Sequence, residues 1–421
     1  MGVRILAFFA ASALFAADEQ QLALALKAQS DFDRVNLATA PAVREAEICI
    51  QSQAALLPVA PAEELPSVHY RKGYCTLAEA AVTRDSAAFR QAAAEFDAAV
   101  AAWPGRAPKK SKLPPEPVPS ALQALGPISR LNAAPGDAAT VDAAKNELSG
   151  AVANPTCSAA VMSPERCRET LETARQWLGW IALGKEEIEE AARRFQGFDT
   201  TGWPAWVAGR IAFRDRKYPE AARQYRAALD VWTRREPSLL SQRLGPQPIL
   251  PRALADLGGA QLLARDTAAA IATLDNAIKA DPAAARAYWL RARAKELAGQ
   301  TAAAFTDYNM AARTALANAP EDVSGEGSVY RGILLYRRKE FSQAEDEFAA
   351  AATRGVPADL KADATAWRHL AAVASGACGS EREYLERSLA TVSPYFPRDD
   401  ARAAMTACPA GLSSTAGARA K

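Results

Sequence analysis

Small and large apolar residues recur at fixed places in six segments of the chain, and this pattern predicts paired helices. The segments begin at Gly73, Glu172, Gly202, Pro251, Ala285 and Gly325. Each has a small residue at its eighth place, which lets two helices approach closely. Those residues are Ala80, Gly179, Gly209, Gly258, Ala292 and Gly332. A repeated unit of this kind is the first feature to seek, because it determines the fold.

The second half of each segment repeats as well. The twentieth place is always alanine, at Ala92, Ala191, Ala221, Ala270, Ala304 and Ala344. One helical turn later, the twenty-fourth place holds a large residue, at Phe96, Phe195, Tyr225, Leu274, Tyr308 and Phe348. The twenty-seventh place is alanine except at Phe198, and Pro104 and Pro282 close two of the units, where a helix must stop.

This pattern resembles the tetratricopeptide repeat, a helix-turn-helix unit of about 34 residues. The clearest copies run from Leu257-Gly258 to Pro282 and from Tyr218 to Ala228. The resemblance implies an all-α fold in which helical hairpins stack into a right-handed α-solenoid, because one hairpin cannot bury both of its faces. Some units carry insertions or run short, so we expect an irregular solenoid.

Breaks in the pattern divide the chain into six parts. We expect a signal peptide at residues 1–17, an N-terminal helical block with one repeat-like unit at 18–104, and a proline-rich linker at 105–136. The main repeat array follows at 137–358. Capping helices occupy 359–411, and the small, polar residues 412–421 form a disordered tail.

The N-terminus indicates export. Arg4 is followed by about a dozen apolar residues, whereas a membrane-spanning helix needs roughly 20. Ala16 and Ala17 offer a cleavage point. We therefore expect a periplasmic or secreted protein without stable membrane insertion, and a retained N-terminal anchor is the alternative.

The six cysteines predict three disulfides, because an even number is typical of exported chains. Residues equidistant from the turn of an antiparallel hairpin lie side by side. Cys49 and Cys75 centre on Ala62 in a proline-containing break, Cys157 and Cys167 centre on Met162, and Cys378 and Cys408 centre on Ser393. These three pairs are the predicted bonds, and six reduced core thiols are the alternative.

Charge and motifs argue against several function classes. The formal net charge is +2, from 50 basic and 48 acidic residues, which gives no electrostatic reason to expect nucleic acid. The sequence has no phosphate-binding loop, no Gly-x-Ser-x-Gly and no His-Glu-x-x-His. Its two histidines, His69 and His369, cannot build a histidine-rich metal site. We therefore expect no enzyme, no cofactor and no metal.

The resemblance also implies a binding groove. In tetratricopeptide proteins the first helix of each pair lines a concave groove, mainly through its second, fifth, ninth, twelfth and thirteenth places. Aromatic residues and arginines, which often carry the energy of binding surfaces, predominate there. The candidates are Trp180, Trp203, Trp206, Arg210, Phe213, Arg214, Arg286, Trp289, Arg293, Tyr336 and Arg337, and the same places hold Gln176, Arg252 and Leu262.

Two tryptophan–arginine pairs among these candidates have the same spacing. Trp206 with Arg210, and Trp289 with Arg293, lie four residues apart and hence on one helix face. An arginine beside an indole can bind a carboxylate while the ring covers an aliphatic neighbour. The alternative is that the tryptophans fill the core and the arginines are solvated at its edge.

These observations favour an exported scaffold that binds a protein or peptide partner in a Trp/Arg-lined groove. A structural subunit of a cell-envelope assembly or secretion complex is the first alternative. The second is a glycan-acting enzyme, for which Glu186-Glu187 and Glu189-Glu190 could supply acid and base groups.

Overall fold

The structure is a computed structural model in which two compact units of helices are distinguished. It describes residues 19–37, 42–103, 117–159, 161–234, 243–317, 325–356 and 358–408. The first unit, here unit 1, extends to Phe198 and includes a later segment that ends at Gln247. Unit 2 comprises residues 199–234 and the chain from Pro248 onwards. The expected signal peptide and tail lie outside the described residues, as does the start of the expected linker.

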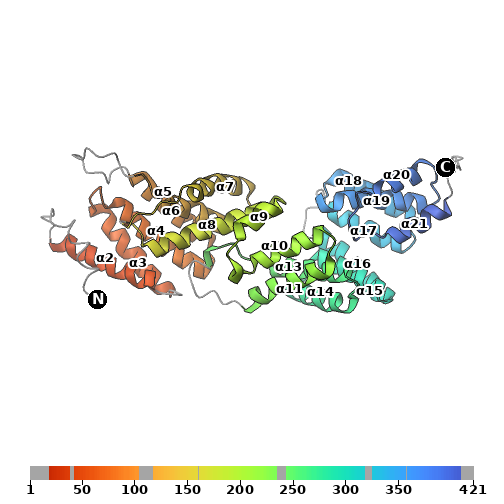
Figure 1. The fold of residues 1–421 in the computed structure, drawn as a ribbon, viewed down its shortest axis with the longest axis horizontal. Coiled ribbons are helices and arrows are strands. Elements are labelled where there is room, and N and C mark those ends of the chain that lie inside the picture. Colours follow the sequence, from red (N-terminus) through yellow and green to blue (C-terminus); the bar gives the residue numbers. More distant parts are fainter. Residues whose placement is uncertain are drawn as a thin grey trace. The chain divides into compact units, whose positions relative to one another are not determined.

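Unit 1 is built from helices that follow one another in space as in sequence (Figure 1). They are α2 (Glu19–Leu37), α3 (Val43–Leu56), α4 (Leu65–Thr83), α5 (Ser86–Ala102), α6 (Ser120–Ala133), α7 (Ala138–Ala153), α8 (Pro164–Gly184) and α9 (Ile188–Phe195), with a short 3-10 turn at Leu57–Val59.

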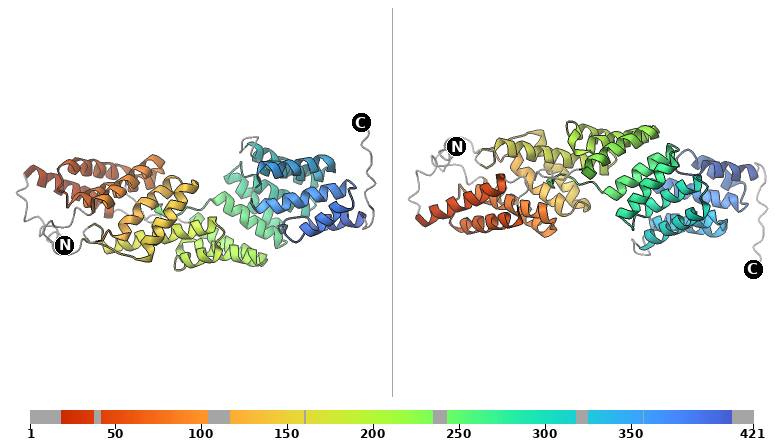
Figure 2. Two further views of the ribbon diagram at one scale, coloured as in Figure 1. Left: turned by 90° about the horizontal axis from the view of Figure 1, so that it is seen from above. Right: turned by 90° about the horizontal axis from the view of Figure 1, so that it is seen from below.

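Unit 2 has the same construction. A 3-10 turn (Asp199–Thr201) precedes α10 (Trp203–Arg214), α11 (Tyr218–Arg234), α13 (Leu250–Leu263), α14 (Thr267–Ala280), α15 (Ala285–Leu297) and α16 (Thr301–Ala317). Then come α17 (Gly325–Arg337), α18 (Phe341–Arg354), α19 (Ala358–Ala374), α20 (Ser380–Ser388) and α21 (Arg398–Ala407). Figure 2 shows the helices of each unit paired side by side from two further directions. The described residues contain no strand, and the prediction of an all-α fold is confirmed.

The close approach of the two helices in a hairpin confirms the predicted repeat. A Cβ added at Gly209 would lie 2.5 Å from the ring of Tyr225, and one at Gly258 would lie 2.5 Å from Leu274 Cγ. Gly179 meets Phe195, and Gly332 meets Phe348, in the same way. The eighth and twenty-fourth places are therefore the contact points of the two helices in these hairpins.

The register of the first unit differs from the prediction. Gly73, at the first place of that segment, faces Phe96 at 3.0 Å from its added Cβ. The turn of this hairpin falls at Arg84, the twelfth place, whereas the turns of the other five segments fall at the fifteenth. An earlier turn moves the contact point toward the start of the first helix.

Each of those five turns uses one left-handed residue. Glu186, Arg216, Arg265 and Lys339 have φ between 60° and 67°, and Gly299 has φ 76°. The amide after each donates to the carbonyl five residues before it, as from Asp266 to Gln261 at 3.0 Å and from Glu340 to Leu335 at 3.0 Å. This closure satisfies carbonyls that the helix end leaves without a partner.

The expected linker at 105–136 contains a buried helix, which corrects the prediction for its second half. Residues 104–116 lie outside the described part, but Ser120–Ala133 form α6, with Leu122, Leu125 and Ile128 buried. Prolines in that stretch suggested an extended chain. Pro127 nevertheless lies inside α6, where it packs in the core of unit 1.

The three disulfides have the predicted pairing. Cys49 bonds to Cys75, Cys157 to Cys167, and Cys378 to Cys408. The first two lie in unit 1 and the third in unit 2. Each bond joins two segments that are close in sequence, so each links neighbouring elements of one unit.

Candidate partner-binding face

Two of the predicted groove residues, Trp203 and Trp206, are buried inside the α10–α11 hairpin. The ring of Trp206 lies 4.5 Å from that of Tyr225 and 5.3 Å from that of Trp232, between centroids. Trp203 meets Trp232 at 5.1 Å, and Trp232 Nε1 donates to the Thr201 carbonyl at 2.7 Å. Both tryptophans have the packing role that the sequence left as the alternative.

Trp180 belongs to the other unit. It lies on α8, half-buried, with its ring 5.4 Å from that of Trp177.

The other candidates lie on the first helices of the hairpins of unit 2, and several of them meet one surface. We call this surface the first-helix face and define it by residues of α10, α13 and α15 around the hydroxyl of Tyr225 and the ring of Tyr395. It consists of Arg210, Phe213, Asp256, Gly259, Arg286 and Trp289.

The first-helix face holds a segment of the chain itself. This segment, residues 392–398, leads from α20 into the first residue of α21 and is called the strap. The ring of Tyr395 lies 6.1 Å from that of Phe213 and 5.5 Å from that of Trp289. Tyr395 is consequently only 9% exposed. The strap bridges helices that are far apart in sequence.

Further contacts hold the two ends of the strap against α19 and α20. Asp363 on α19 accepts from the Ser393 amide at 2.7 Å and from its hydroxyl at 2.5 Å. Phe396 packs 5.4 Å from the ring of Trp367. Arg398 Nη1 donates to the Leu389 carbonyl at 2.7 Å.

Gly259 makes room for the strap. A Cβ at this position would lie 2.3 Å from Tyr395 Oη and 3.2 Å from Tyr395 Cζ. The preceding residue, Gly258, already provides the close approach of α13 to α14. The two adjacent glycines thus serve two different contacts. The repeat predicts the contact at Gly258 and does not predict the one at Gly259.

A charged cluster lies next to the strap. Arg337 Nε is 3.0 Å from Glu296 Oε1, and Tyr308 donates to Glu296 Oε2 at 2.9 Å. Arg293 also pairs with Glu296, and Arg337 pairs with Asp400 on α21. Burial disfavours the charged guanidinium, but Tyr308, Glu296 and Asp400 more than offset it and raise the pKa of Arg337.

Tyr336, another predicted groove residue, is buried beside this cluster. Its ring lies 5.1 Å from that of Trp367 and 5.3 Å from that of Phe341. Burial raises the pKa of Tyr336 to about 12. The charge of Asp400 contributes to this rise, and the charge of Arg337 opposes it.

The other end of the first-helix face is polar and partly open to solvent. Arg286 Nη2 lies 3.9 Å from Asp256 Oδ1, and these side chains are 33% and 17% exposed. Arg210 is half-buried, and Arg214 is exposed beside Asp215 at 3.4 Å. Burial raises the pKa of Tyr225, and Asp256 adds to this rise while Arg210 and Arg286 oppose it.

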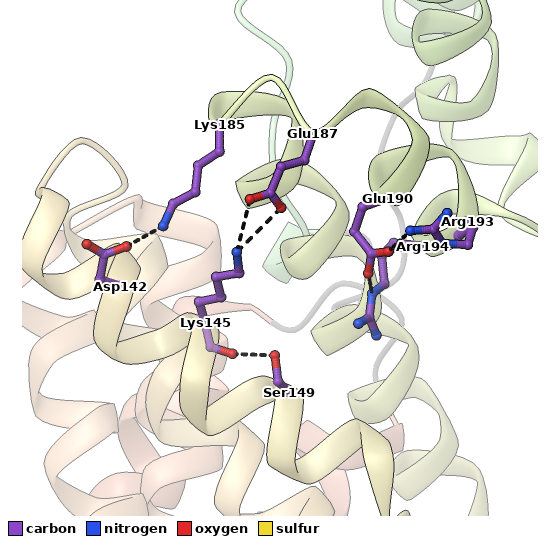
Figure 3. Close-up of polar contacts among 8 residues, drawn as sticks. All are labelled: Asp142, Lys145, Ser149, Lys185, Glu187, Glu190, Arg193 and Arg194. Atoms are coloured by element: carbon purple, nitrogen blue, oxygen red, sulfur yellow. Dashed lines mark hydrogen bonds and ion pairs between the residues drawn. The ribbon is translucent and has the colours of Figure 1, made fainter.

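The acidic pairs considered for glycan chemistry lie at the start of α9 in unit 1. Figure 3 shows Glu187 turned toward Lys145, with both oxygens 3.4 Å from Nζ, while Lys185 reaches Asp142 at 2.6 Å. Glu190 accepts from Arg193 and Arg194. The bonds from these arginines lower the pKa of Glu190, whereas a general acid needs a raised one.

The histidines and other potential ligands show no assembled site. His69 Nδ1 lies 2.8 Å from Glu95 Oε2, and His369 Nδ1 lies 2.7 Å from Glu381 Oε2. Within the described ranges, no three His, Cys, Asp or Glu side chains are grouped to hold a metal ion. None of the described helices is long and apolar enough to cross a membrane.

Comparison with known proteins gives similarity at the level of structure. No protein-family model matches the sequence, and no curated protein matches it. A tetratricopeptide repeat protein from Parabacteroides merdae ATCC 43184 is 13% identical, with a TM-score of 0.43, over 68% of this chain and 99% of that one.

Two further solved structures are similar over much of their length. Yeast Tom70 is 11% identical, with a TM-score of 0.37, over 87% of this chain and 85% of its own. The apo form of RapI is 8% identical, with a TM-score of 0.40, over 77% and 86%. At these values the similarities say nothing about what this chain binds, so its function is inferred from its own contacts.

Three residues of the candidate site were not predicted from the sequence. Tyr395 follows Ser393-Pro394, which indicates only a break between helices, and Asp363 is one acid among many. Gly259 had a visible signal, because a second glycine directly after Gly258 has no role in the repeat.

Proposed function

We propose that the protein is a non-catalytic scaffold that binds a polypeptide segment of a partner protein on the first-helix face. The observation that carries this proposal is the strap. It is a segment seated on the first helices α10, α13 and α15 through contacts of Tyr395, and it also donates hydrogen bonds to a buried carboxylate. A surface that accommodates one such segment has the chemistry to accommodate another.

The predicted residues take different parts in this proposal. Trp203 and Trp206 set the position of α10 by packing against α11. Arg210 and Arg286, which are partly open to solvent, offer guanidinium groups to a carboxylate of the partner. Trp289, Arg293, Tyr336 and Arg337 support the part of the face that the strap covers.

We further propose that the protein works outside the cytoplasm. Three disulfides are typical of an oxidising compartment, and the apolar N-terminal stretch has the pattern of an export signal. A periplasmic or secreted location follows from this proposal.

A double variant tests the binding face. Arg210→Ala with Arg286→Ala removes two guanidinium groups without opening the core. Loss of a binding hot spot costs about 2 kcal/mol or more, which is roughly thirtyfold in affinity. We expect partner proteins captured from the envelope fraction by the wild type to be lost from the variant, as measured by quantitative mass spectrometry.

The matched control is Arg223→Ala with Arg234→Ala on α11, where the side chains are 74% and 80% exposed. This control should retain the captured proteins. If the control loses them and the Arg210/Arg286 variant keeps them, the contacts lie on the second helices. The structural-subunit alternative then replaces the proposal.

A further inference from the structure

We propose that the strap is a built-in ligand of the first-helix face, and that a partner binds by displacing it with a segment of the same chemistry. That chemistry is a hydroxyl residue followed two and three places later by adjacent aromatic residues, as in Ser393-Pro394-Tyr395-Phe396. The inference rests on the proposed function and adds to it the kind of segment that binds.

The first observation is the fit between Tyr395 and Gly259. The phenol ring lies against a helix position that has no side chain, and any larger residue there would overlap Tyr395 Oη at 2.3 Å. Packing of α13 against α14 requires a small residue at Gly258 and places no such demand on Gly259. The face therefore has a recess suited to an aromatic ring.

The second observation is the buried carboxylate of Asp363. It is 2% exposed and accepts two hydrogen bonds from Ser393, one from the amide and one from the hydroxyl. A buried carboxylate is costly without such donors. A displacing segment must supply equivalent donors, and this selects a serine or threonine with a free backbone amide.

The third observation is the indole of Trp289. Its Nε1 is buried and has no hydrogen-bond partner among the described residues, although the ring is 5.5 Å from that of Tyr395. A buried donor without an acceptor is unfavourable. A partner segment that presents a carbonyl at this place gains a contact that the strap does not make, and so can compete with it.

The strap is also held in a way that permits exchange. It lies between Cys378 and Cys408, whose disulfide closes the surrounding loop. The strap can therefore leave the face while its ends stay attached to unit 2. A tethered segment of this kind acts at a local concentration on the order of millimolar. A free segment can bind only molecules whose strap has left the face, so its apparent affinity falls in proportion to the fraction of such molecules.

The test uses the full chain and a fluorescent synthetic peptide with the sequence of residues 391–398, Thr-Val-Ser-Pro-Tyr-Phe-Pro-Arg. Fluorescence anisotropy measures its affinity for the wild type and for Tyr395→Ala, which removes the ring that fills the recess. We expect the peptide to bind Tyr395→Ala at least tenfold more tightly than the wild type. The proposal is overturned if the peptide binds the wild type and Tyr395→Ala with equal affinity while circular dichroism shows the same helical content for both proteins.

Two further variants control the test. Tyr384→Ala removes a tyrosine of α20 that is 45% exposed and stacks on His369 of α19, and this variant should bind the peptide as weakly as the wild type. Gly259→Ala in the Tyr395→Ala background puts a methyl group into the recess, and it should abolish the tight binding. Tight binding that survives this change places the peptide elsewhere and contradicts the proposal.

Should Tyr395→Ala lose its fold, Ser393→Ala serves in its place. It removes one hydrogen bond to Asp363 without removing ring volume, and we expect a gain of several fold in peptide affinity. No gain in this folded variant is a negative result for the proposal. A wild-type dimer that the peptide converts to monomers also overturns it, because the strap is then exchanged between two copies.

The outcomes for the two proposals are separable. If capture of partner proteins depends on Arg210 and Arg286 while Tyr395→Ala binds no peptide, the scaffold function stands and the strap is only part of the core. If the peptide binds Tyr395→Ala tightly while the Arg210/Arg286 variant still captures the partner proteins, the strap inference stands and the captured proteins use another surface.

Discussion

Glycine residues set how closely the two helices of a hairpin can approach. At Gly179 an added Cβ would lie 2.8 Å from the ring of Phe195, which is fully buried and cannot move aside. At Gly150, on the exposed side of α7, an added Cβ would meet nothing within 4 Å. Both glycines are helical and both belong to unit 1. They form a matched pair.

Alanine at these two positions should change stability in opposite directions. Gly179→Ala overpacks the hairpin and should lower the free energy of unfolding by roughly 1–3 kcal/mol. Gly150→Ala should raise it by about 0.5–1 kcal/mol, because alanine favours the helix. Urea denaturation followed by circular dichroism measures both. A stabilising Gly179→Ala would contradict the hairpin register.

Buried tyrosines make the protein sensitive to alkaline pH. Tyr70 is 1% exposed, and burial raises its pKa to about 12, against the opposing charges of Arg166 and Arg71. The unfolded chain ionises tyrosine near pH 10, so the folded state holds the extra proton between about pH 10 and 12. Stability from Tyr70 is therefore full below pH 10 and is lost as pH rises through this interval.

Tyr70→Phe should reduce that loss. We expect the free energy of unfolding to fall less between pH 9 and pH 11.5 in this variant than in the wild type, as measured by urea titration at both pH values. Tyr384→Phe, at an exposed ring, is the control. If Tyr70→Phe and the wild type lose the same amount, Tyr70 already ionises in the folded state.

The hairpin is the element that the sequence predicts best. Its contacts are local, so a small residue and a large residue sixteen places apart suffice to recognise it, as with Gly209 and Tyr225. The groove was harder to predict from the same pattern. Trp206 occupies a groove place in the repeat, but its ring packs against Trp232 of the adjacent helix inside the hairpin. The repeat pattern does not include Trp232, so it cannot predict this contact.

Two features depend on contacts that no local pattern shows. The prolines in and before α6 predict a linker, but Leu122, Leu125 and Ile128 bury this helix among the helices of unit 1. The strap was expected only as a break, because nothing near Tyr395 indicates Phe213 and Trp289 as its neighbours. Long-range packing decides both.

The three disulfides differ in how open they are to solvent. Cys49 and Cys75 are fully buried and Cys408 is 2% exposed, whereas Cys157 is exposed. Cys157 also lines a hollow of about 440 Å³ together with Pro155 and Leu171. A soluble reductant must reach a sulfur atom to react with it.

Limited reduction should consequently open Cys157–Cys167 first. We expect alkylation under mild reducing conditions to label Cys157 and Cys167 before the other four cysteines, as determined by peptide mass mapping. Full reduction should then lower the melting temperature, since closing a loop of this size stabilises by about 3 kcal/mol in the chain-entropy estimate. Earlier labelling of Cys49 or Cys75 would contradict the order.

At the scale of the whole molecule, unit 1 is not continuous in sequence. The chain leaves it at Phe198 and returns with the segment that ends at Gln247. Leu244 in this segment is 6% exposed, and its carbonyl accepts from Trp177 Nε1 at 2.8 Å and from Asn132 Nδ2 at 2.9 Å. The returning segment thus supplies an acceptor to the buried Trp177 indole of α8 and to the half-buried Asn132 amide of α6.

Leu244→Ala should therefore weaken unit 1 and leave unit 2 unchanged. Removing a buried leucine side chain costs about 2–5 kcal/mol. We expect faster hydrogen exchange in α6 and α8 but not in α17 and α18, measured by mass spectrometry. Leu274→Ala, in the core of unit 2, should give the reverse pattern. Faster exchange in all four helices of Leu244→Ala would mean that the two units unfold together.

The discontinuity of unit 1 also has a consequence for synthesis on the ribosome. Helices α2 to α9 emerge before Leu244. The chain between the end of α9 and Leu244 includes the α10–α11 hairpin of unit 2. At about 5–20 residues per second, this interval lasts on the order of a few seconds. Throughout it, the Trp177 indole lacks the Leu244 carbonyl as its acceptor, and the Asn132 amide has only the Ile128 carbonyl of its own helix. A nascent chain that stalls before residue 243 therefore presents an unfinished unit 1 to chaperones and proteases.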